Sequence, residues 1–306
     1  MFKELQRDKS ILDMVPDYPI PRYTSYPTAP HFKNSINSKI YISWLNNIKS
    51  TENLSLYIHI PFCNSLCYFC GCHTTATKKY EQIDRYVNFL IKEIHLIKSK
   101  INFKPKVSHI HFGGGTPSIL KSKDLKLIMD TINKKFNVHN KCEIAMEVDP
   151  RFFRIDLIKV LKKHKFNRIS IGVQDFSIIV QKNINRIQSF KSTKDLINSF
   201  RSYGIKNINI DLMYGLPYQS IKSFLLTLNK VISLKPDRIS IFGYAHVPWM
   251  KKRQNLIKGK ILENKERLQL YNLASDYLQN NKYVSIGIDH YARYNSLIIK
   301  KIKKRN

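Results

Sequence analysis

The stretch Cys63-Asn-Ser-Leu-Cys67-Tyr-Phe-Cys70-Gly-Cys72 holds four cysteines within ten residues and follows the apolar run 56–60. Three of them have the spacing C-x3-C-x2-C, and the fourth comes one glycine later. Thiolates spaced in this way bind soft metals and hold iron–sulfur clusters. Three thiolates on one loop can bind three irons of a [4Fe–4S] cube and leave the fourth iron open, as a catalytic site requires. We therefore predict that Cys63, Cys67 and Cys70 ligate a [4Fe–4S] cluster.

Two other interpretations of the cysteines are weaker. Structural zinc is bound by four closing ligands, usually as two separated pairs, which this spacing does not provide. A disulfide needs an oxidising compartment, but the start of the sequence lacks the apolar core of a signal peptide. We therefore expect a cytoplasmic protein with reduced cysteines. The fifth cysteine, Cys142, is interpreted as an ordinary small buried residue.

The cysteine spacing resembles that of the radical S-adenosylmethionine (SAM) superfamily, in which the open iron binds the amino and carboxylate groups of SAM. Tyr68 and Phe69 fill the slot where that family has an aromatic residue before the third cysteine. Further motifs, in the same order, resemble the oxygen-independent coproporphyrinogen III oxidase family over residues 21–293. They are PRYTSYPTAPHF at 21–32, LYIHIPF at 56–62, GGGTP at 113–117, EVDPR at 147–151, GVQDF at 172–176, NIDLMYGLP at 209–217 and GIDHYAR at 287–293.

The resemblance implies an oxidoreductase of haem biosynthesis that decarboxylates coproporphyrinogen III to protoporphyrinogen IX without oxygen. One electron from a donor that the sequence does not identify enters the cluster and splits SAM into methionine and a 5′-deoxyadenosyl radical. The radical removes hydrogen from the β-carbon of a propionate, and loss of carbon dioxide and one electron leaves a vinyl group. Two rounds complete the reaction, and the cofactors rather than the protein supply the hard chemistry.

The resemblance also assigns residues to the cofactors. Residues at SAM-contacting positions are Tyr57, Phe69, Gly114, Gly115, Thr116, Glu147, Gln174, Arg186, Asp211 and Ala245. A second SAM is implied, with a shell made of Gly115, Thr116, Gln174, Arg186, Asp211 and Ala245. The candidate catalytic residues are Tyr57, His59 and Cys72.

Simpler interpretations of these residues remain open. A glycine-rich turn is often only a tight turn, although glycine also lets the backbone approach a ligand. Glu147 could be a solvated carboxylate or a partner of Arg151, and an isolated arginine such as Arg186 is most often a surface residue. Asp211 stands within an apolar run, where burial without a partner is costly, and this favours a ligand role. Strand alternation places Tyr57 and His59 on one face.

Short apolar runs alternate with amphipathic helical segments along the chain. The predicted strands are 56–60, 108–112, 143–148, 168–173, 207–213 and 238–244, with helices such as 80–98, 123–135 and 224–232 between them. This alternation predicts parallel strands. Six units indicate an α/β fold, an open (β/α)6 barrel related to the TIM barrel. In barrels the chemistry lies at the carboxyl ends of the strands, where all the motifs fall.

Three regions are expected: an N-terminal arm with a lead-in helix at 1–50, the radical SAM barrel at 51–293 and a basic tail at 294–306. The proline-rich stretch 16–30 cannot be a continuous helix. The resemblance implies that this arm reaches the active-site opening. The resemblance also implies a helical C-terminal domain after the barrel, and we expect this chain to lack it.

The net charge of the chain is +30. Phosphate binding, attraction of an acidic small molecule and compositional drift toward Lys, Ile and Asn could each explain it. Because the lysines are scattered, drift is favoured, and no specific nucleic acid is expected. No apolar run is long enough to span a membrane, and a monomer is expected. The alternatives to the oxidase are a haem-chaperone-like protein, an RNA-modifying radical SAM enzyme and an inactive remnant.

Overall fold

The computed structural model describes residues 31–303 of the 306-residue chain. The predicted proline-rich arm at 16–30 lies outside the described residues, so its approach to the active-site opening stays a prediction. The expected lead-in helix is present as α2 (Ser38–Asn46), whose N-cap Asn37 accepts a hydrogen bond from the backbone N–H of Ile40. In the described part of the chain, no helix is both long and apolar enough to cross a membrane.

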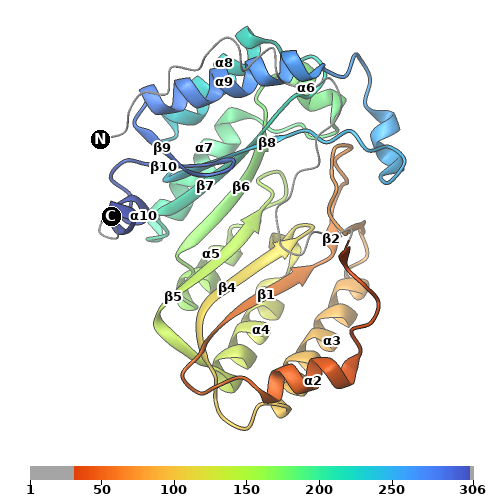
Figure 1. The fold of residues 1–306 in the computed structure, drawn as a ribbon, viewed down its shortest axis with the longest axis vertical. Helices are drawn as coiled ribbons and strands as arrows, with labels where there is room; N and C mark the ends of the chain where they lie inside the picture. Colours follow the sequence, from red (N-terminus) through yellow and green to blue (C-terminus); the bar gives the residue numbers. More distant parts are fainter. Residues whose placement is uncertain (1–30, 304–306) are drawn as a thin grey trace.

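Six parallel strands form the main part of an eight-stranded sheet (Figure 1). In sheet order they are β1 (Asn53–Ile60), β4 (Lys106–Gly114), β5 (Asn137–Val148), β6 (Arg168–Gln174), β7 (Asn207–Tyr214) and β8 (Arg238–Gly243). Each pairs in parallel with its neighbours in this order. All six predicted strands are thus confirmed, and because β1 lies at one edge of the sheet, the barrel is open as expected.

Amphipathic helices cover the outer face of this sheet. They are α3 (Tyr80–Ser99), α4 (Ser122–Lys135), α5 (Asp156–Lys163), α6 (Ile178–Asn183), α7 (Phe190–Ser202) and α8 (Ile221–Ser233). On α3 the buried residues Ile83, Val87, Leu90 and Ile94 recur every three or four positions, so they form one apolar stripe. This stripe packs into a single large core with the buried side chains of the strands.

The sheet ends in an antiparallel pair that the alternating pattern did not predict. β10 (His290–Arg293) runs antiparallel to β8, and β9 (Tyr283–Gly287) forms the second edge beyond it. The long α9 (Asn264–Asn280) packs beside α8 and leads into β9. The predicted tail contains α10 (Leu297–Lys303), where Ile299 is buried. The division of the chain into three regions stays a prediction.

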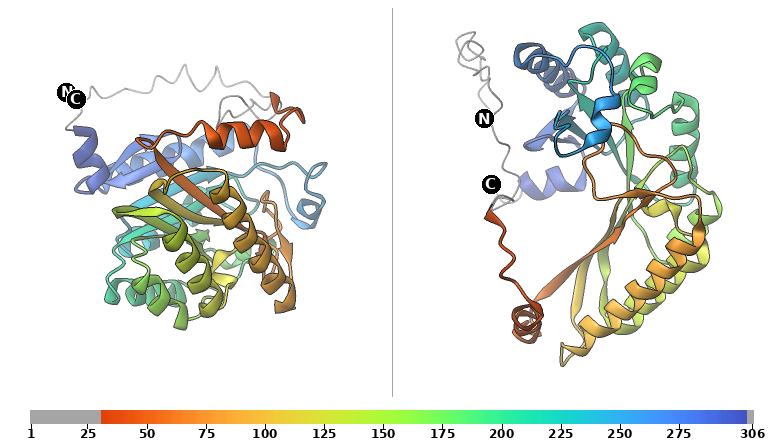
Figure 2. Two further views of the ribbon diagram at one scale, coloured as in Figure 1. Left: turned by 90° about the horizontal axis from the view of Figure 1, so that it is seen from below. Right: turned by 90° about the vertical axis from the view of Figure 1, so that its right-hand side faces the viewer.

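The carboxyl ends of the parallel strands meet at one end of the sheet, where the cysteine loop follows β1 (Figure 1). The two-residue strands β2 (Phe62–Cys63) and β3 (Thr75–Ala76) pair in parallel and close this loop. In the right-hand view of Figure 2 the loop lies beside the blue segment that contains the 3-10 helix η3 (Lys252–Leu256). Segments from both halves of the chain therefore meet at this end of the sheet.

Candidate active site

The cysteine loop is held by backbone hydrogen bonds to two neighbouring segments. The N–H groups of Gly115 and Thr116 donate to the carbonyls of Ile60 and Phe62, both at 2.9 Å. The Tyr68 N–H donates to the Ile184 carbonyl at 3.0 Å. These bonds fix the path of the loop without using its thiols. They also place the glycine-rich turn after β4 directly against the loop.

Two of the predicted ligands are buried and already have polar partners. The sulfur of Cys63 lies 3.3 Å from Oγ1 of Thr74 and 3.4 Å from Oγ1 of Thr116. The sulfur of Cys67 accepts hydrogen bonds of 3.4 Å from Nη2 of Arg151 and from Nη1 of Arg186. Two guanidinium groups therefore donate to this one sulfur and fix its position beside the cavity.

Cys70 and Cys72 interact with each other. A hydrogen bond from the Cys72 thiol lowers the pKa of Cys70 to about 6, and the charges of Arg253 and Lys251 act in the same direction. The pKa of Cys72 is raised by that same hydrogen bond and by burial. Cys70 is therefore the thiolate of this pair and Cys72 the thiol. All five cysteines of the chain are unpaired, so the disulfide interpretation is wrong.

The donor set fits an iron–sulfur cluster better than a single metal ion. In the described residues no three His, Cys, Asp or Glu side chains converge closely enough to hold one ion. The cysteines instead surround a cavity, as ligands of a larger group must. Next to it, Nε of Arg186 and Nη1 of Arg253 are buried without a hydrogen-bond partner among the described residues. Such unsatisfied cationic donors suit an anionic group near the cysteine loop.

One cavity of about 400 Å³ brings most of the predicted site together. The predicted residues that line it are Cys63, Cys67, Phe69, Cys70, Cys72, Gly114, Gly115, Thr116, Glu147, Gln174, Arg186 and Asp211. They come from the ends of β4, β5, β6 and β7, from the cysteine loop and, in the case of Arg186, from the connection between α6 and α7. A side chain at Gly115 would have no room, because its Cβ would lie 2.3 Å from Oγ1 of Thr74 and 3.0 Å from the sulfur of Cys63. This close approach is the reason for glycine at that position.

Glu147 is paired with a histidine rather than with Arg151. Its Oε1 lies 3.1 Å from Nε2 of His111, and its Oε2 accepts a bond of 3.3 Å from the N–H of Gly114. The ring of His111 stacks on Tyr57, with ring centroids 5.9 Å apart. The carboxylate of Glu147 is thus aimed at the glycine turn, where an amino group of a ligand could bind it.

Arg151 pairs with Asp149 instead. Nη2 of Arg151 lies 2.6 Å and Nη1 of Arg186 lies 3.3 Å from Oδ2 of Asp149, and all three side chains are more than nine-tenths buried. Burial alone would raise the pKa of Asp149, but Arg186 and Arg151 outweigh it and hold that pKa below its ordinary value. This carboxylate therefore orients the two arginines that contact Cys67. The interpretation of Arg186 as a surface residue is wrong.

Asp211 has partners within the protein. Its Oδ2 accepts a bond of 2.9 Å from the hydroxyl of Ser170, and its Oδ1 accepts one of 2.7 Å from Nδ2 of Asn209. Burial raises the pKa of Asp211, and the nearby charge of Glu147 raises it further. The costly burial inferred from the sequence is therefore offset by these hydrogen bonds, and a ligand role for Asp211 stays a prediction.

Three predicted residues lie outside the lining of this cavity. Tyr57 and His59 are on the same face of β1, as expected from alternation, and the Tyr57 hydroxyl is 3.0 Å from Nδ1 of His59. Both rings cover the glycine turn, because a Cβ at Gly113 would meet Tyr57 and one at Gly114 would meet His59. Ala245 uses its carbonyl to accept a bond of 3.0 Å from Nε2 of Gln254. Their roles toward SAM and in catalysis stay predictions.

Sequence reasoning missed several residues of the site. Asp149 and Arg151 stand inside the quoted motif EVDPR, and His111 stands two residues before the glycine turn, so the motifs themselves carried a signal for them. Arg253 and Gln254 had no such signal. Their place beside the cysteine loop depends on a contact between segments more than 180 residues apart in the sequence.

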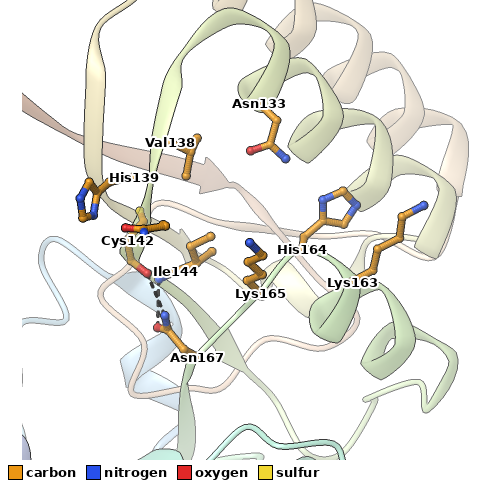
Figure 3. A pocket seen from close by; sticks show the side chains of 10 residues that line it. Asn133, Val138, His139, Cys142, Ile144, Lys163, His164, Lys165 and Asn167 are labelled. Carbon is orange, nitrogen blue, oxygen red and sulfur yellow. Dashed lines mark hydrogen bonds between the residues drawn. The ribbon is translucent and has the colours of Figure 1, made fainter.

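A second cavity, of about 180 Å³, lies at the amino ends of β5 and β6, away from the motifs (Figure 3). It is lined in part by Cys142, which is buried as predicted. Asn167 also lines this cavity. Its side chain is held against β5, because it accepts a bond of 3.1 Å from the Ile144 N–H and donates one of 2.8 Å to the Cys142 carbonyl (Figure 3). None of the predicted cofactor residues lines this cavity.

The comparisons with known proteins agree with this geometry. The family model of the radical SAM superfamily matches residues 57–231. An oxygen-independent coproporphyrinogen III oxidase from Bradyrhizobium diazoefficiens is 43% identical over 90% of this chain, and the same enzyme from Escherichia coli is 39% identical. The chain spans 61% and 60% of the lengths of these two relatives.

The solved structure of the coproporphyrinogen III oxidase HemN from Escherichia coli, described as a radical SAM enzyme, superposes with a TM-score of 0.87 at 37% identity. The match covers 92% of this chain and 65% of that one. The predicted fold and the predicted resemblance are thus confirmed. This chain belongs to the radical SAM superfamily, and the relatives that it matches over 90% of its length are oxygen-independent coproporphyrinogen III oxidases.

Proposed function

We propose that this chain decarboxylates coproporphyrinogen III to protoporphyrinogen IX in anaerobic haem biosynthesis, with a [4Fe–4S] cluster and SAM. The observation that supports it best is the single cavity lined by Cys63, Cys67 and Cys70 together with the glycine turn and Glu147. This cavity lies at the carboxyl ends of parallel strands, where barrel enzymes carry out their chemistry. The names of the relatives support the choice of substrate.

In this proposal the three cysteines hold the cluster and the surrounding residues hold SAM. The cluster and SAM together supply the one-electron chemistry that removes a hydrogen from a propionate. Arg151 and Arg186 hold the Cys67 sulfur in position through their hydrogen bonds. Glu147, which accepts the Gly114 N–H, would bind the amino group of SAM.

A second SAM is part of the proposal. Its shell would be Gly115, Thr116, Gln174, Arg186, Asp211 and Ala245, of which all but Ala245 line the cavity. The buried Nε of Arg186 has no hydrogen-bond partner among residues 31–303, and a carboxylate of SAM would satisfy it. Equilibrium binding of SAM to the reconstituted protein tests this directly: a stoichiometry of two supports the shell, and a stoichiometry of one contradicts it.

The function is tested by an anaerobic assay of the reconstituted protein with SAM, dithionite and coproporphyrinogen III. We expect 5′-deoxyadenosine and protoporphyrinogen IX, and neither product from Cys67→Ser. Formation of 5′-deoxyadenosine without any porphyrin product would contradict the proposed substrate. A modified nucleoside in tRNA formed under the same conditions would favour the RNA-modifying alternative instead.

A further inference from the structure

Trp249 and Met250 are 75% and 71% exposed, which makes them the two most exposed large apolar side chains in the described part of the chain. They stand side by side on the connection between β8 and α9. An exposed tryptophan adds little to the stability of the fold, because an apolar side chain stabilises a protein mainly when it is buried. Tryptophan is also enriched among the residues that dominate protein interfaces. The pair therefore has the character of an anchor for a partner.

The loop that carries this pair is firmly held. Gln254 is buried, and its Oε1 accepts a bond of 2.6 Å from the Val247 N–H. Its Nε2 donates to the carbonyls of Ala245 and Phe69, at 3.0 and 3.2 Å. The N–H groups of Met250 and Lys251 both donate to the Val247 carbonyl at 2.9 Å. Trp249 is thus presented on a fixed turn, and binding would not have to order it.

This turn adjoins the cysteine loop. Phe69, which accepts the bond from Gln254, stands directly before Cys70. Lys251 reaches the same loop, because its Nζ lies 3.4 Å from the carbonyl oxygen of Cys72. In the right-hand view of Figure 2 the cysteine loop and the segment around η3 lie next to each other on the face turned to the viewer. A protein bound at Trp249 would therefore lie close to the proposed cluster.

The segment around Trp249 is positively charged, and no acidic residue lies near it in the sequence. Lys251, Lys252 and Arg253 are consecutive, and no Asp or Glu occurs between Asp237 and Glu263. The segment that carries the cysteine loop likewise has no acidic residue between Glu52 and Glu81. Complementary charge steers partners and excludes partners of like charge. The surface accordingly fits an acidic partner.

We propose that Trp249, Met250 and Lys252 form the docking surface for an acidic, low-potential one-electron carrier protein that reduces the cluster. This rests on the proposed function, which needs one electron for each SAM that is cleaved. The carrier is oxidised by one electron and the cluster is reduced by one. No bond is made or broken, and no proton or leaving group moves in this step. The apolar pair anchors the carrier, and the lysine steers it.

The first test compares two reductants on the reconstituted protein in the absence of coproporphyrinogen III. A photoreduced acidic flavodoxin serves as the protein donor and dithionite as the small one, and the loss of cluster absorbance is followed by stopped flow. Trp249→Ala and Lys252→Glu should slow reduction by flavodoxin at least about tenfold, as expected for an interface anchor. Their reduction by dithionite should stay at the wild-type rate. The matched control is Trp44→Ala, since Trp44 is the other tryptophan of the chain, 52% exposed on α2.

Two outcomes of this test would overturn the docking surface. One is a wild-type rate with flavodoxin in both variants. The other is an equal slowing with dithionite, which would assign the defect to the cluster itself. No porphyrin is present in this test, so both outcomes can be interpreted even if coproporphyrinogen III is not the substrate.

The second test measures binding without the cluster. In a Trp44→Phe background, the fluorescence of Trp249 should be quenched by oxidised flavodoxin to saturation, and the affinity should fall as salt screens the charges. Lys252→Glu should weaken that binding. If the quenching depends on the concentration of this protein alone, a second copy of the chain is the occupant and the proposal is overturned. The absence of quenching at every concentration of flavodoxin would also overturn it.

Discussion

The hydroxyl of Thr227 on α8 donates a hydrogen bond of 2.9 Å to the carboxylate of Asp175, the residue that follows Gln174 at the end of β6. Both side chains are buried. The Asp175 N–H bonds back to the Val173 carbonyl at 2.9 Å, so Gln174 is the centre of a three-residue turn with φ of 68°. Turns of this kind are strained for residues other than glycine and persist only where the surroundings determine them. The buried Asp175 and Thr227 thus hold a cavity-lining residue in a strained conformation.

Thr227→Val removes this hydroxyl at nearly constant volume. The carboxylate of Asp175 keeps the Gln219 side chain and the Ser177 N–H as donors, but it loses the Thr227 hydroxyl, and the Phe176 N–H loses its bond to that hydroxyl. We expect a loss of about 1–3 kcal/mol in the free energy of unfolding, the usual cost of a buried polar group left unsatisfied. Urea unfolding followed by circular dichroism measures it.

Thr131→Val is the matched control for this change. Thr131 is also buried on a helix, but its hydroxyl donates only to the Leu127 carbonyl one turn earlier. Its replacement should change the stability by less than about 0.5 kcal/mol. Equal losses in the two variants would show that the contact between Thr227 and Asp175 has no special role.

Asp149→Asn removes the negative charge between Arg151 and Arg186. Loss of one partner from a buried ion pair typically costs about 3–5 kcal/mol, because the remaining charge is left without compensation. The exposed pair of Asp156 with Arg154 provides the control, and Asp156→Asn should cost no more than about 1 kcal/mol. The comparison of both variants with the wild type by urea unfolding at neutral pH checks these values.

The pH dependence of this loss has a defined sign. The folded state lowers the pKa of Asp149, so its stabilisation is fully present above the pKa of the unfolded state and is lost as the pH falls through the folded pKa. The difference in stability between wild type and Asp149→Asn should therefore be largest near neutral pH and shrink below about pH 4. A difference that stays constant down to pH 3 would contradict the charge-based explanation.

The strand pattern and the motifs were enough to predict the parallel sheet and most of the residues that line the cavity, because the motifs that contribute them lie at the ends of parallel strands. Parallel strands align their carboxyl ends, so residues such as Glu147 and Asp211 had to meet once the fold was known. Alternation alone placed Tyr57 and His59 together. These inferences depend on local sequence and on one topological rule.

The other parts of the structure depend on contacts that no local pattern encodes. The hairpin of β9 and β10 is built from four- and five-residue strands that resemble loop segments in the sequence. Arg151 pairs with Asp149, which also contacts Arg186, whereas Glu147 is engaged by His111 and the Gly114 N–H. The η3 segment and the residue before it meet the cysteine loop through tertiary contacts such as those of Gln254 and Lys251.

Cys72→Ser and Cys67→Ser distinguish a ligand of the cluster from a cysteine that only lies near it. If only Cys63, Cys67 and Cys70 bind the cluster, anaerobically reconstituted Cys72→Ser should retain the iron content of the wild type. Cys67→Ser should lose it, because three thiolates are the minimum for the predicted cube. Iron and sulfide determination together with the visible absorption spectrum provides the measurement. A loss of iron in Cys72→Ser would make Cys72 a ligand and overturn the assignment.

Gly115→Ala and Gly71→Ala test the packing of the glycine turn against the cysteine loop. A Cβ at Gly115 would lie 2.3 Å from Oγ1 of Thr74 and 2.7 Å from the Phe62 carbonyl oxygen, whereas a Cβ at Gly71 meets nothing within 4 Å. Because the Phe62 oxygen belongs to the backbone of the loop, it can give way only if the loop moves away from the turn. We therefore expect Gly115→Ala to lower both the iron content after reconstitution and the affinity for SAM, while Gly71→Ala matches the wild type in both. Iron analysis and equilibrium dialysis with labelled SAM measure the two effects, and a Gly115→Ala protein with full iron and unchanged SAM affinity would show that the turn does not shape the cofactor site.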